Sequence, residues 1–254
     1  MSCSTSDKFQ QDRIKLLQTP FLSVIIPAFN EEQRLPNTLE QVLAYLRDQP
    51  YRSEILVIEN ASQDNTYQVA KEFAQSHTTA NLPIQVIREP QRGKGNAVKR
   101  GIYAASGAYL FMCDADLSMP VTEINRFFPP ELEGFDISIA SREASGAVRY
   151  NEPAYRHFVG RIFNTLIRVL ALPELNDTQC GFKCFKAAIA EDLFRDLDIT
   201  GWSFDVEILY LAQRRGHRIV EIPIPWYYNP DSHIRVVKDS FQMAFDIFKI
   251  RLKG

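Results

Sequence analysis

Two aspartates separated by one residue follow an apolar run, and together they could hold a metal ion. Asp114 and Asp116 come directly after residues 108–113, which are uncharged and typical of a buried parallel strand. Two carboxylates this close repel each other in a crevice unless a cation or water lies between them. Mg²⁺ and Mn²⁺ prefer carboxylate oxygens and commonly hold substrate phosphates as well. The pair therefore predicts a metal-assisted phosphate site, although an isolated pair of this kind is also typical of a solvated turn.

Polar residues also follow three other predicted strands, at 27–32, 59–64 and 92–97. Because ligands of an open α/β sheet bind at the carboxyl ends of its strands, we expect the four segments to meet at one edge. Lys94 stands between two glycines at the start of a predicted helix, which is a favourable position for a diphosphate. The spacing around Lys94 is not that of an ATPase phosphate loop. Together the segments predict a nucleotide site.

The hydrophobic pattern indicates which elements position these residues. Strands are predicted at 22–26, 54–58, 84–87, 109–113 and 135–140, and helices at 36–47, 64–75 and 96–105. Alternating strands and helices are typical of an α/β fold with a mainly parallel sheet flanked by helices. No linker interrupts the pattern, so we expect one continuous domain.

The second half of the sequence is more helical. Helices are predicted at 155–172, 204–215 and 235–252, with a short strand at 217–222. The last helix is amphipathic. Its apolar stripe consists of Val237, Phe241, Ala244, Phe245, Phe248 and Leu252.

Composition excludes several functional classes. A chain of 254 residues with a net charge of −2 gives no support for a nucleic-acid binder. No apolar run approaches the ~18 residues of a membrane-spanning helix. Residues 1–18 lack the apolar core of a signal peptide. The four cysteines (Cys3, Cys113, Cys180 and Cys184) lack the paired spacing of a zinc site, which favours a reduced cytosolic setting.

Seven segments together resemble one known family. They are residues 24–31, 59–64, 92–98, 114–117, 141–142, 177–183 and 202–207. On these segments the chain resembles the inverting glycosyltransferases of family 2, which have the GT-A fold, and is most similar to the dolichyl-phosphate β-glucosyltransferases among them. The resemblance covers roughly residues 21–226. It implies a GT-A domain at 21–232. The polar N-terminal sequence predicts a flexible segment at 1–20, and the apolar spacing near the C-terminus predicts an amphipathic helix at 233–254.

The resemblance also implies roles for individual residues. Residues expected to bind the nucleotide sugar are Pro27, Phe29, Glu31, Glu59, Asn60, Lys94, Asp114, Ala115 and Asp116. A metal ion, Mg²⁺ or Mn²⁺, is expected at Asp114, Asp116 and Ser118. The acceptor phosphate is expected at Arg142 and Arg149. Catalytic roles are expected for Asp116, Arg142, Asp177 and Asp205.

Two positions need separate comment. Many relatives carry two aspartates where this chain has Glu59 and Asn60; an Asn carbonyl can still accept a hydrogen bond from the uracil N3–H group, but it carries no charge. Asp205 and Glu207 lie on different faces of a predicted helix, so only one should face the site. We favour Asp205, and a solvated helix face is the alternative for such charges.

The predicted reaction is transfer of a hexose, glucose from UDP-glucose, to a polyprenyl or dolichyl phosphate with inversion. A phosphate monoester has a second pKa of about 6, so this acceptor needs little help from a base. Arg142, Arg149, Lys94 and the metal ion would supply counter-charge for two phosphates. One alternative is transfer to a sugar hydroxyl with Asp177 or Asp205 as the base. Another, suggested by the Glu59-Asn60 pair, is a nucleotide-sugar-binding protein without turnover.

A lipid acceptor requires access to a membrane. The helix at 235–252 combines its apolar stripe with Lys238, Lys249 and Arg251, and Lys253 follows it, which suits a helix lying in the membrane interface. The helix at 155–172, with three arginines, could form a second contact. We therefore expect a cytoplasmic protein associated peripherally with the cytoplasmic face of a membrane. The alternative is that both helices pack on the sheet or on a second copy of the chain, so a homo-oligomer remains open.

Overall fold

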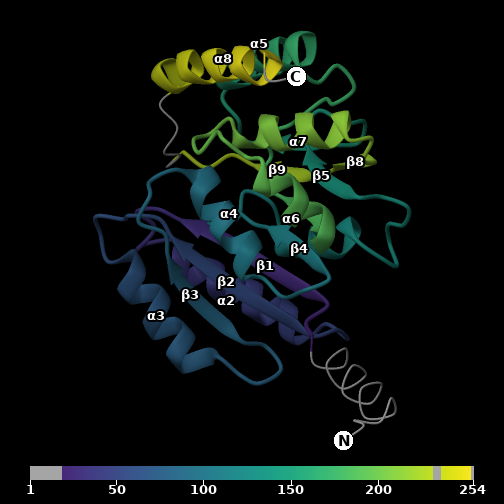
Figure 1. Ribbon diagram of the computed structural model, residues 1–254. Helices are drawn as coiled ribbons and strands as arrows, with labels where there is room; N and C mark the ends of the chain where they lie inside the picture. The colour runs from purple at the N-terminus through teal and green to yellow at the C-terminus, as the bar shows by residue number, and fades with distance from the viewer. Residues whose placement is uncertain (1–18, 231–235, 253–254) are drawn as a thin grey trace, which may run out of the picture.

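A seven-stranded sheet forms the centre of the molecule (Figure 1). The computed structural model describes residues 19–230 and 236–252. The strand order is β3-β2-β1-β4-β7-β5-β8. These strands are β1 (Leu22–Ala28), β2 (Ser53–Glu59), β3 (Ile84–Arg88), β4 (Tyr109–Met112), β5 (Ile137–Ser141), β7 (Lys183–Lys186) and β8 (Ile219–Pro223). A flexible segment is predicted at 1–20, and its residues 1–18 lie outside the described residues.

The sheet is mainly parallel, as the alternating pattern predicts. β1 pairs in parallel with β2 and β4, β2 with β3, and β5 with β8. Only β7 runs antiparallel, between β4 and β5. This strand is absent from the sequence prediction, because a lysine stands at each end of its four residues. Its direction matters for function, since an antiparallel strand begins at the edge where its neighbour β4 ends.

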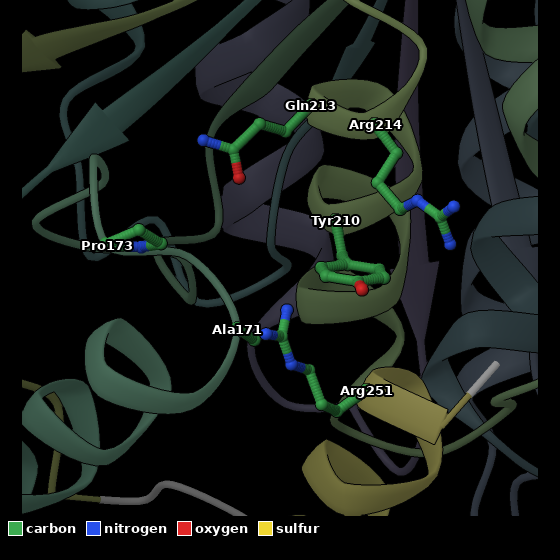
Figure 2. Close-up of a pocket in the computed structure, with 6 residues that line it drawn as sticks. All are labelled: Ala171, Pro173, Tyr210, Gln213, Arg214 and Arg251. Carbon is green, nitrogen blue, oxygen red and sulfur yellow. The ribbon is translucent and has the colours of Figure 1, made fainter. Parts of the chain in front are cut away.

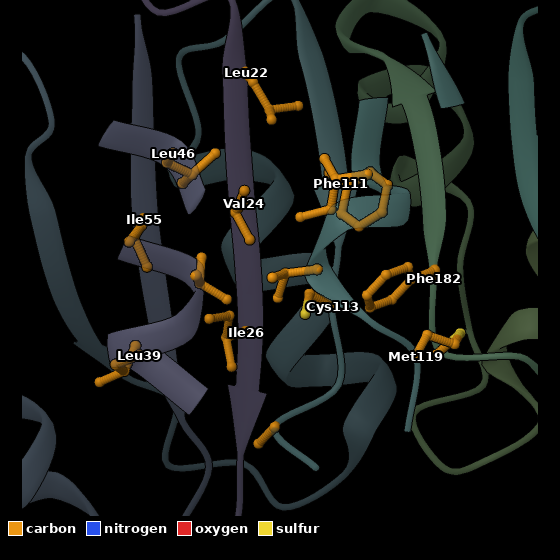
Figure 3. Packing of buried hydrophobic residues seen from close by; sticks show 14 of the residues in the cluster. Leu22, Val24, Ile26, Leu39, Leu46, Ile55, Phe111, Cys113, Met119 and Phe182 are labelled. Carbon is orange, nitrogen blue, oxygen red and sulfur yellow. The ribbon is translucent and has the colours of Figure 1, made fainter. Parts of the chain in front are cut away.

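Helices cover both faces of the sheet. The helices are α2 (Leu35–Arg47), α3 (Thr66–His77), α4 (Lys94–Ala104), α5 (Ala154–Leu170), α6 (Ala187–Arg195), α7 (Phe204–Arg214) and α8 (Val236–Leu252), and η1 (Val121–Phe127) is a 3₁₀ helix. Alternate residues of each strand point to opposite faces. Val24 and Ile26 of β1 therefore pack with α2 and α3, whereas Ile25 packs with α4, α6 and α7. Figure 3 shows the first of these clusters, with Leu39 and Leu46 of α2 beside β1.

Two helices, α5 and α8, lie side by side outside the α4–α6–α7 layer (Figure 1). Met243, Ile247 and Ile250 form the buried face of α8. Phe245 and Phe248, which belong to the predicted stripe, are 58% and 57% exposed. The sequence-based stripe is therefore not the packing face of α8, because the residues that contact α5 and α7 lie on another side of the helix. In the part of the chain that the structure describes, none of the helices is long and apolar enough to cross a membrane.

A small second sheet joins two distant segments. β6 (Val148–Tyr150) pairs in parallel with β9 (Pro225–Tyr227). The rings of Tyr150 and Tyr227 stack with centroids 4.6 Å apart. The Tyr227 N–H group donates to the Ser118 carbonyl at 2.8 Å. This pairing ties the segment after β4 to the segment that carries Arg149, which sequence periodicity does not predict.

Candidate active site

The aspartate pair and Lys94 meet at the carboxyl edge of the sheet. Asp114 and Asp116 follow β4, and Lys94 is the first residue of α4. Lys94 Nζ lies 2.7 Å from Asp114 Oδ1. Although burial by itself lowers the pKa of Lys94, the surrounding carboxylates, led by Asp114, raise it above its ordinary value. Lys94 therefore remains a cation at physiological pH.

The aspartate pair has the chemistry that a divalent cation requires. Burial raises the pKa of Asp116, and the Asp114 carboxylate raises it further, against an opposing hydrogen bond from the Ser118 N–H group. That N–H group lies 3.0 Å from Asp116 Oδ1. A cation bound here would relieve the repulsion, so the residues fit Mg²⁺ or Mn²⁺. Among the residues that the structure describes, His, Cys, Asp and Glu form no three-membered metal cluster.

The antiparallel strand β7 brings the segment 177–183 against the aspartate pair. A Cβ atom at Gly181 would lie 2.2 Å from Asp114 Oδ2, so a side chain at this position would displace the Asp114 carboxylate. The glycine lets this segment lie directly against Asp114. Ala115, between the two aspartates, is buried, and its carbonyl accepts a hydrogen bond from Thr38 Oγ1 at 2.6 Å.

Asp177 and Arg142 form a buried two-pronged ion pair. Arg142 Nε and Nη2 lie 2.6 and 2.9 Å from the two carboxylate oxygens of Asp177. Burial alone would raise the pKa of Asp177, but the Arg142 guanidinium outweighs it and lowers the pKa to about 2. A carboxylate with so low a pKa is a poor general base at neutral pH. Asp177 is therefore suited to positioning Arg142 and not to accepting a proton.

The other predicted acceptor residue, Arg149, is also paired. Glu143 and Glu152 both form ion pairs with its guanidinium. The Trp226 ring lies beside both arginines, 5.4 Å from Arg142 Cζ and 5.8 Å from Arg149 Cζ. The structure thus brings Arg142 and Arg149 together around one indole ring.

Sequence reasoning assigned no site role to Arg156, which lies near the start of α5. Its guanidinium stacks 5.3 Å from the Tyr228 ring. Arg156 Nε is buried and has no hydrogen-bond partner among the described residues. An unpartnered buried donor of this kind is a candidate for a ligand contact. The only signal in the sequence is that Arg156 is one of three arginines in the predicted helix.

Asp205 lies near Lys94 and adds a further ion pair to the one between Lys94 and Asp114. Asp205 Oδ1 lies 2.8 Å from Nζ of the buried Lys183, a residue of the recognised segment 177–183 to which the sequence assigned no role. Burial raises the pKa of Asp205, and Lys183 and Lys94 only partly oppose that effect. The charges of Asp114, Lys94, Asp205 and Lys183 therefore alternate. Of Asp205 and Glu207, it is Asp205 that interacts with Lys183, Lys94 and Asp114.

Glu207 is not on a solvated helix face. Its side chain is 2% exposed, and Oε2 accepts hydrogen bonds from the N–H groups of Asp198 and Ile199 at 3.1 and 2.7 Å. The carbonyl of the next residue, Thr200, accepts a hydrogen bond from the Gly95 N–H group at 2.8 Å. Glu207 therefore supports the start of α4 through this loop.

Asn60 holds the opposite side of the same turn. Its Oδ1 accepts a hydrogen bond from the Gly93 N–H group at 2.8 Å, and its Nδ2 donates to the carbonyls of Glu89 and Gln91 at 3.1 and 2.7 Å. The N–H groups of Gly93 and Gly95 are thus both engaged by the protein. These two N–H groups are therefore not available to a diphosphate, whereas the Lys94 side chain lies at the sheet edge beside Asp114. The side-chain amide of Asn60 is likewise committed to the turn.

The predicted nucleoside residues line the exits of β1 and β2. The guanidinium of Arg92 lies 4.4 Å from the centre of the Phe29 ring. Glu31 pairs with Arg34 at 2.7 Å, and Glu59 pairs with Arg88 at 3.1 Å. Pro27 is partly buried in β1. Phe29 and Pro27 therefore offer apolar surface, whereas both glutamates already have partners.

Comparisons with known proteins show the family of this chain. Residues 23–194 match the family described as glycosyl transferase family 2. A dolichyl-phosphate beta-glucosyltransferase of Dictyostelium discoideum is 35% identical over 244 residues, which are 92% of this chain and 74% of that protein. The human protein of that name is 31% identical over 247 residues, 92% of this chain and 76% of the relative.

Solved structures share the fold. The Mycobacterium tuberculosis glucosyl-3-phosphoglycerate synthase with uridine diphosphate superposes with a TM-score of 0.63 at 17% identity, covering 100% of this chain and 85% of the synthase. The same synthase with Mn²⁺, UDP-glucose and phosphoglyceric acid superposes with a TM-score of 0.62 at 16% identity. The superposition covers 100% of this chain and 84% of the synthase. These glycosyltransferases share the architecture described above.

Proposed function

The chain belongs to glycosyl transferase family 2, and we propose that it transfers glucose from UDP-glucose to a dolichyl-type polyprenyl phosphate with inversion at the sugar. It is a glycosyltransferase, since relatives that carry this activity in their names match over nine-tenths of its length. The observation that carries the finer proposal is the row of Asp116, Asp114 and Lys94 at the sheet edge, within a chain 35% identical to a dolichyl-phosphate beta-glucosyltransferase.

On the donor side, the residues would hold the diphosphate. Asp114 and Asp116 would bind the divalent ion, and Lys94, which already lies against Asp114, would reach the same phosphates. When bound, Mg²⁺ or Mn²⁺ supplies charge that stabilises the departing UDP. Phe29, with Arg92 over its ring, is the best-placed apolar surface for the uracil base.

The acceptor side favours a phosphate over a sugar hydroxyl. A hydroxyl acceptor needs a base with a pKa near neutrality. Asp177, with a pKa of about 2, does not meet that need. Burial raises the pKa of Asp205, but its side chain is 4% exposed and paired with Lys183, so an acceptor hydroxyl would have little access to it. A phosphate monoester is already ionised and needs only counter-charge.

Arg142 and Arg156 are the best candidates for that counter-charge. The pair with Asp177 uses Nε and Nη2 of Arg142, so the donors of Nη1 remain available to a phosphate. Arg156 has a buried Nε without a partner. Arg149 would contribute less, because two carboxylates already pair with it.

Exposed apolar residues on the outer helices support a lipid acceptor. We define the α5–α8 surface by the exposed apolar residues of these two helices, which are Tyr155, Phe158, Ile162, Val169, Phe245, Phe248 and Leu252. Phe158 is 66% and Phe248 57% exposed. Apolar residues gathered on neighbouring helices of a soluble domain mark an interaction site, and basic residues beside them suit a membrane interface. We expect this surface to lie on the cytoplasmic face of a membrane.

Radiolabelled transfer would test the proposal directly. The protein is incubated with polyprenyl phosphate, Mg²⁺ or Mn²⁺, and a panel of labelled donors: UDP-glucose, UDP-galactose, UDP-N-acetylglucosamine and GDP-mannose. We expect label from UDP-glucose in an acid-labile, organic-extractable lipid. Label only in a neutral glycolipid would favour the sugar-hydroxyl alternative. Binding of UDP-glucose without any transfer or hydrolysis would favour the protein without turnover.

A further inference from the structure

A cavity of about 600 Å³ lies away from the aspartate pair, among α7, α8 and the segment that follows α5 (Figure 2). None of the site residues described above lines it. Its lining residues are Ala171, Pro173, Tyr210, Gln213, Arg214 and Arg251. The proposed reaction gives this cavity no role.

Two guanidinium groups at the cavity lack counter-charge. Arg214 Cζ lies 6.0 Å from the centre of the Tyr210 ring, and Figure 2 shows Arg251 extending from α8 toward the same ring. Among the described residues, neither arginine has a carboxylate partner, whereas the adjacent Arg215 pairs with Asp192 and Asp196. Because the planar guanidinium matches phosphate oxygens in a two-pronged contact, such a cavity suits a phosphate group.

One carboxylate lies near the cavity and weakens its positive field without cancelling it. Glu174 Oε2 accepts a hydrogen bond from Gln213 Nε2 at 3.0 Å. Glu174, Arg214 and Arg251 are all exposed, so water and salt screen the three charges alike. Two arginines against this one glutamate leave the cavity with a net positive charge.

Two exposed apolar residues of the α5–α8 surface are close in sequence to residues that line the cavity. Val169, two residues before Ala171, is 77% exposed, and Leu252, next to Arg251, is 87% exposed. A free phosphate makes no favourable contact with these apolar side chains. A phospholipid requires cationic contacts for its phosphate and apolar contacts for its acyl chains, next to each other.

We propose that this cavity binds the phosphate of an anionic phospholipid whose acyl chains contact the α5–α8 surface. The inference rests on the proposed membrane contact and adds a defined lipid site to it. Arg251 binds from α8 and Arg214 from α7, so an occupied site also fixes the outer helix layer against the domain.

Vesicle binding tests the site. The full-length protein is sedimented with phosphatidylcholine vesicles that contain increasing phosphatidylglycerol. The variant Arg214→Lys/Arg251→Lys keeps both charges but loses the two-pronged geometry, so binding to phosphatidylglycerol should weaken at least fivefold. Arg214→Ala/Arg251→Ala should weaken it roughly thirtyfold, since each basic residue near a membrane contributes about 1 kcal/mol, or roughly fivefold.

The matched control is Arg161→Lys/Arg168→Lys, which makes the same change at two exposed positions of α5. Its binding should stay within twofold of the wild type. If the Arg214/Arg251 lysine variant also binds like the wild type, the attraction is diffuse charge and the site is refuted. If glycerol 3-phosphate binds tightly in calorimetry while vesicle binding is unchanged in all variants, the ligand is a soluble phosphate and the lipid proposal is overturned.

Transfer activity separates this proposal from the proposed function. With a short, water-soluble polyprenyl phosphate and no vesicles, both Arg214/Arg251 variants should transfer like the wild type. Loss of that activity would place the cavity in the transfer machinery or the fold, against the proposal. A wild-type protein that transfers but never binds vesicles would refute the lipid site alone. Cavity-dependent vesicle binding without any transfer would refute the proposed function alone.

Discussion

The two aspartates that follow β4 are held differently, although one residue separates them. Asp114 has Lys94 as a direct partner at 2.7 Å. Asp116 accepts hydrogen bonds from Ser118, and burial raises its pKa. The Asp116 carboxylate therefore gains most from a bound cation, and we expect metal dependence to be strongest there.

Asp116→Asn should abolish transfer while leaving the fold intact. The change removes charge at the sheet edge and adds no volume. Chelation of the metal by EDTA should have the same effect reversibly in the wild type. Initial transfer rates and thermal unfolding measure the two outcomes. Full activity of the wild type in chelator would contradict the metal role of Asp114 and Asp116.

The Asp177–Arg142 pair should make stability depend on acid pH. The folded pKa of Asp177, about 2, lies below its ordinary value of 3.8, so the pair stabilises the fold above pH 4 and loses this effect as the pH falls toward 2. Asp177→Asn leaves Arg142 buried without a counter-charge. This change should lower the free energy of unfolding by roughly 3 kcal/mol at pH 7. The difference in the free energy of unfolding between the wild type and Asp177→Asn should shrink by about 2 kcal/mol between pH 4 and pH 2.

Urea unfolding of both proteins at several pH values measures this difference. If the difference in the free energy of unfolding stays constant from pH 7 to pH 2, the pKa of Asp177 is not lowered in the folded protein. Asp198→Asn, at a carboxylate outside this pair, is a suitable comparison at the same pH values.

At the scale of elements, the turn before α4 is held from two sides. Asn60 at the end of β2 binds three backbone groups of the turn, and the loop supported by Glu207 binds Gly95. A carboxylate at position 60 could not donate to the carbonyls of Glu89 and Gln91. The asparagine therefore positions the turn, with Lys94, before the donor binds.

Asn60→Asp should therefore weaken donor binding. Loss of two buried donors costs about 1–3 kcal/mol each and lets the turn move. We expect the KM for UDP-glucose to rise at least tenfold, with little change in the KM for polyprenyl phosphate. Asn96→Asp, which alters longer and more exposed bonds to the same turn, should change either KM less than threefold.

A double-mutant cycle with Lys94→Ala tests whether Asn60 acts through Lys94. If it does, Asn60→Asp should add almost nothing to the donor-binding loss of Lys94→Ala. Additive losses would mean that Asn60 affects the donor by another route, such as direct contact with the base.

At the scale of the whole molecule, the outer layer of α5 and α8 has two apolar sides. One side, with Met243, Ile247 and Ile250, is buried against the domain. The other carries Phe158, Phe245 and Phe248 and has no covering element in the described part of the chain. The layer includes Arg156, which we propose as a contact of the acceptor phosphate.

Phe158→Ser/Phe248→Ser should stop the protein floating with anionic liposomes. Both side chains are exposed, so the free energy of unfolding should change by less than about 1 kcal/mol. Tyr103→Ser, at a residue of α4 that is 49% exposed, is the matched control and should still float. If the double variant unfolds, or if the wild type never floats, the α5–α8 surface is not a membrane contact.

The sequence alone determined the parallel part of the sheet and the polar edge. Each strand of the first half is a short apolar run followed by polar residues, and both signals are local. Asp114, Asp116 and Lys94 could therefore be assigned to one edge, because parallel strands end on the same side. The recognised segments fixed the family in the same way.

Only the tertiary structure decided how the remaining charges are paired. β7 is four residues long with lysines at its ends, so no periodicity revealed the antiparallel strand that brings Gly181 against Asp114. The partners of Arg142, Asn60 and Glu207 lie in other segments, and their pairing depends on the fold and not on spacing in sequence. The exposed side of α8 also emerged only from packing, because a helix with two apolar sides does not indicate by itself which one is covered.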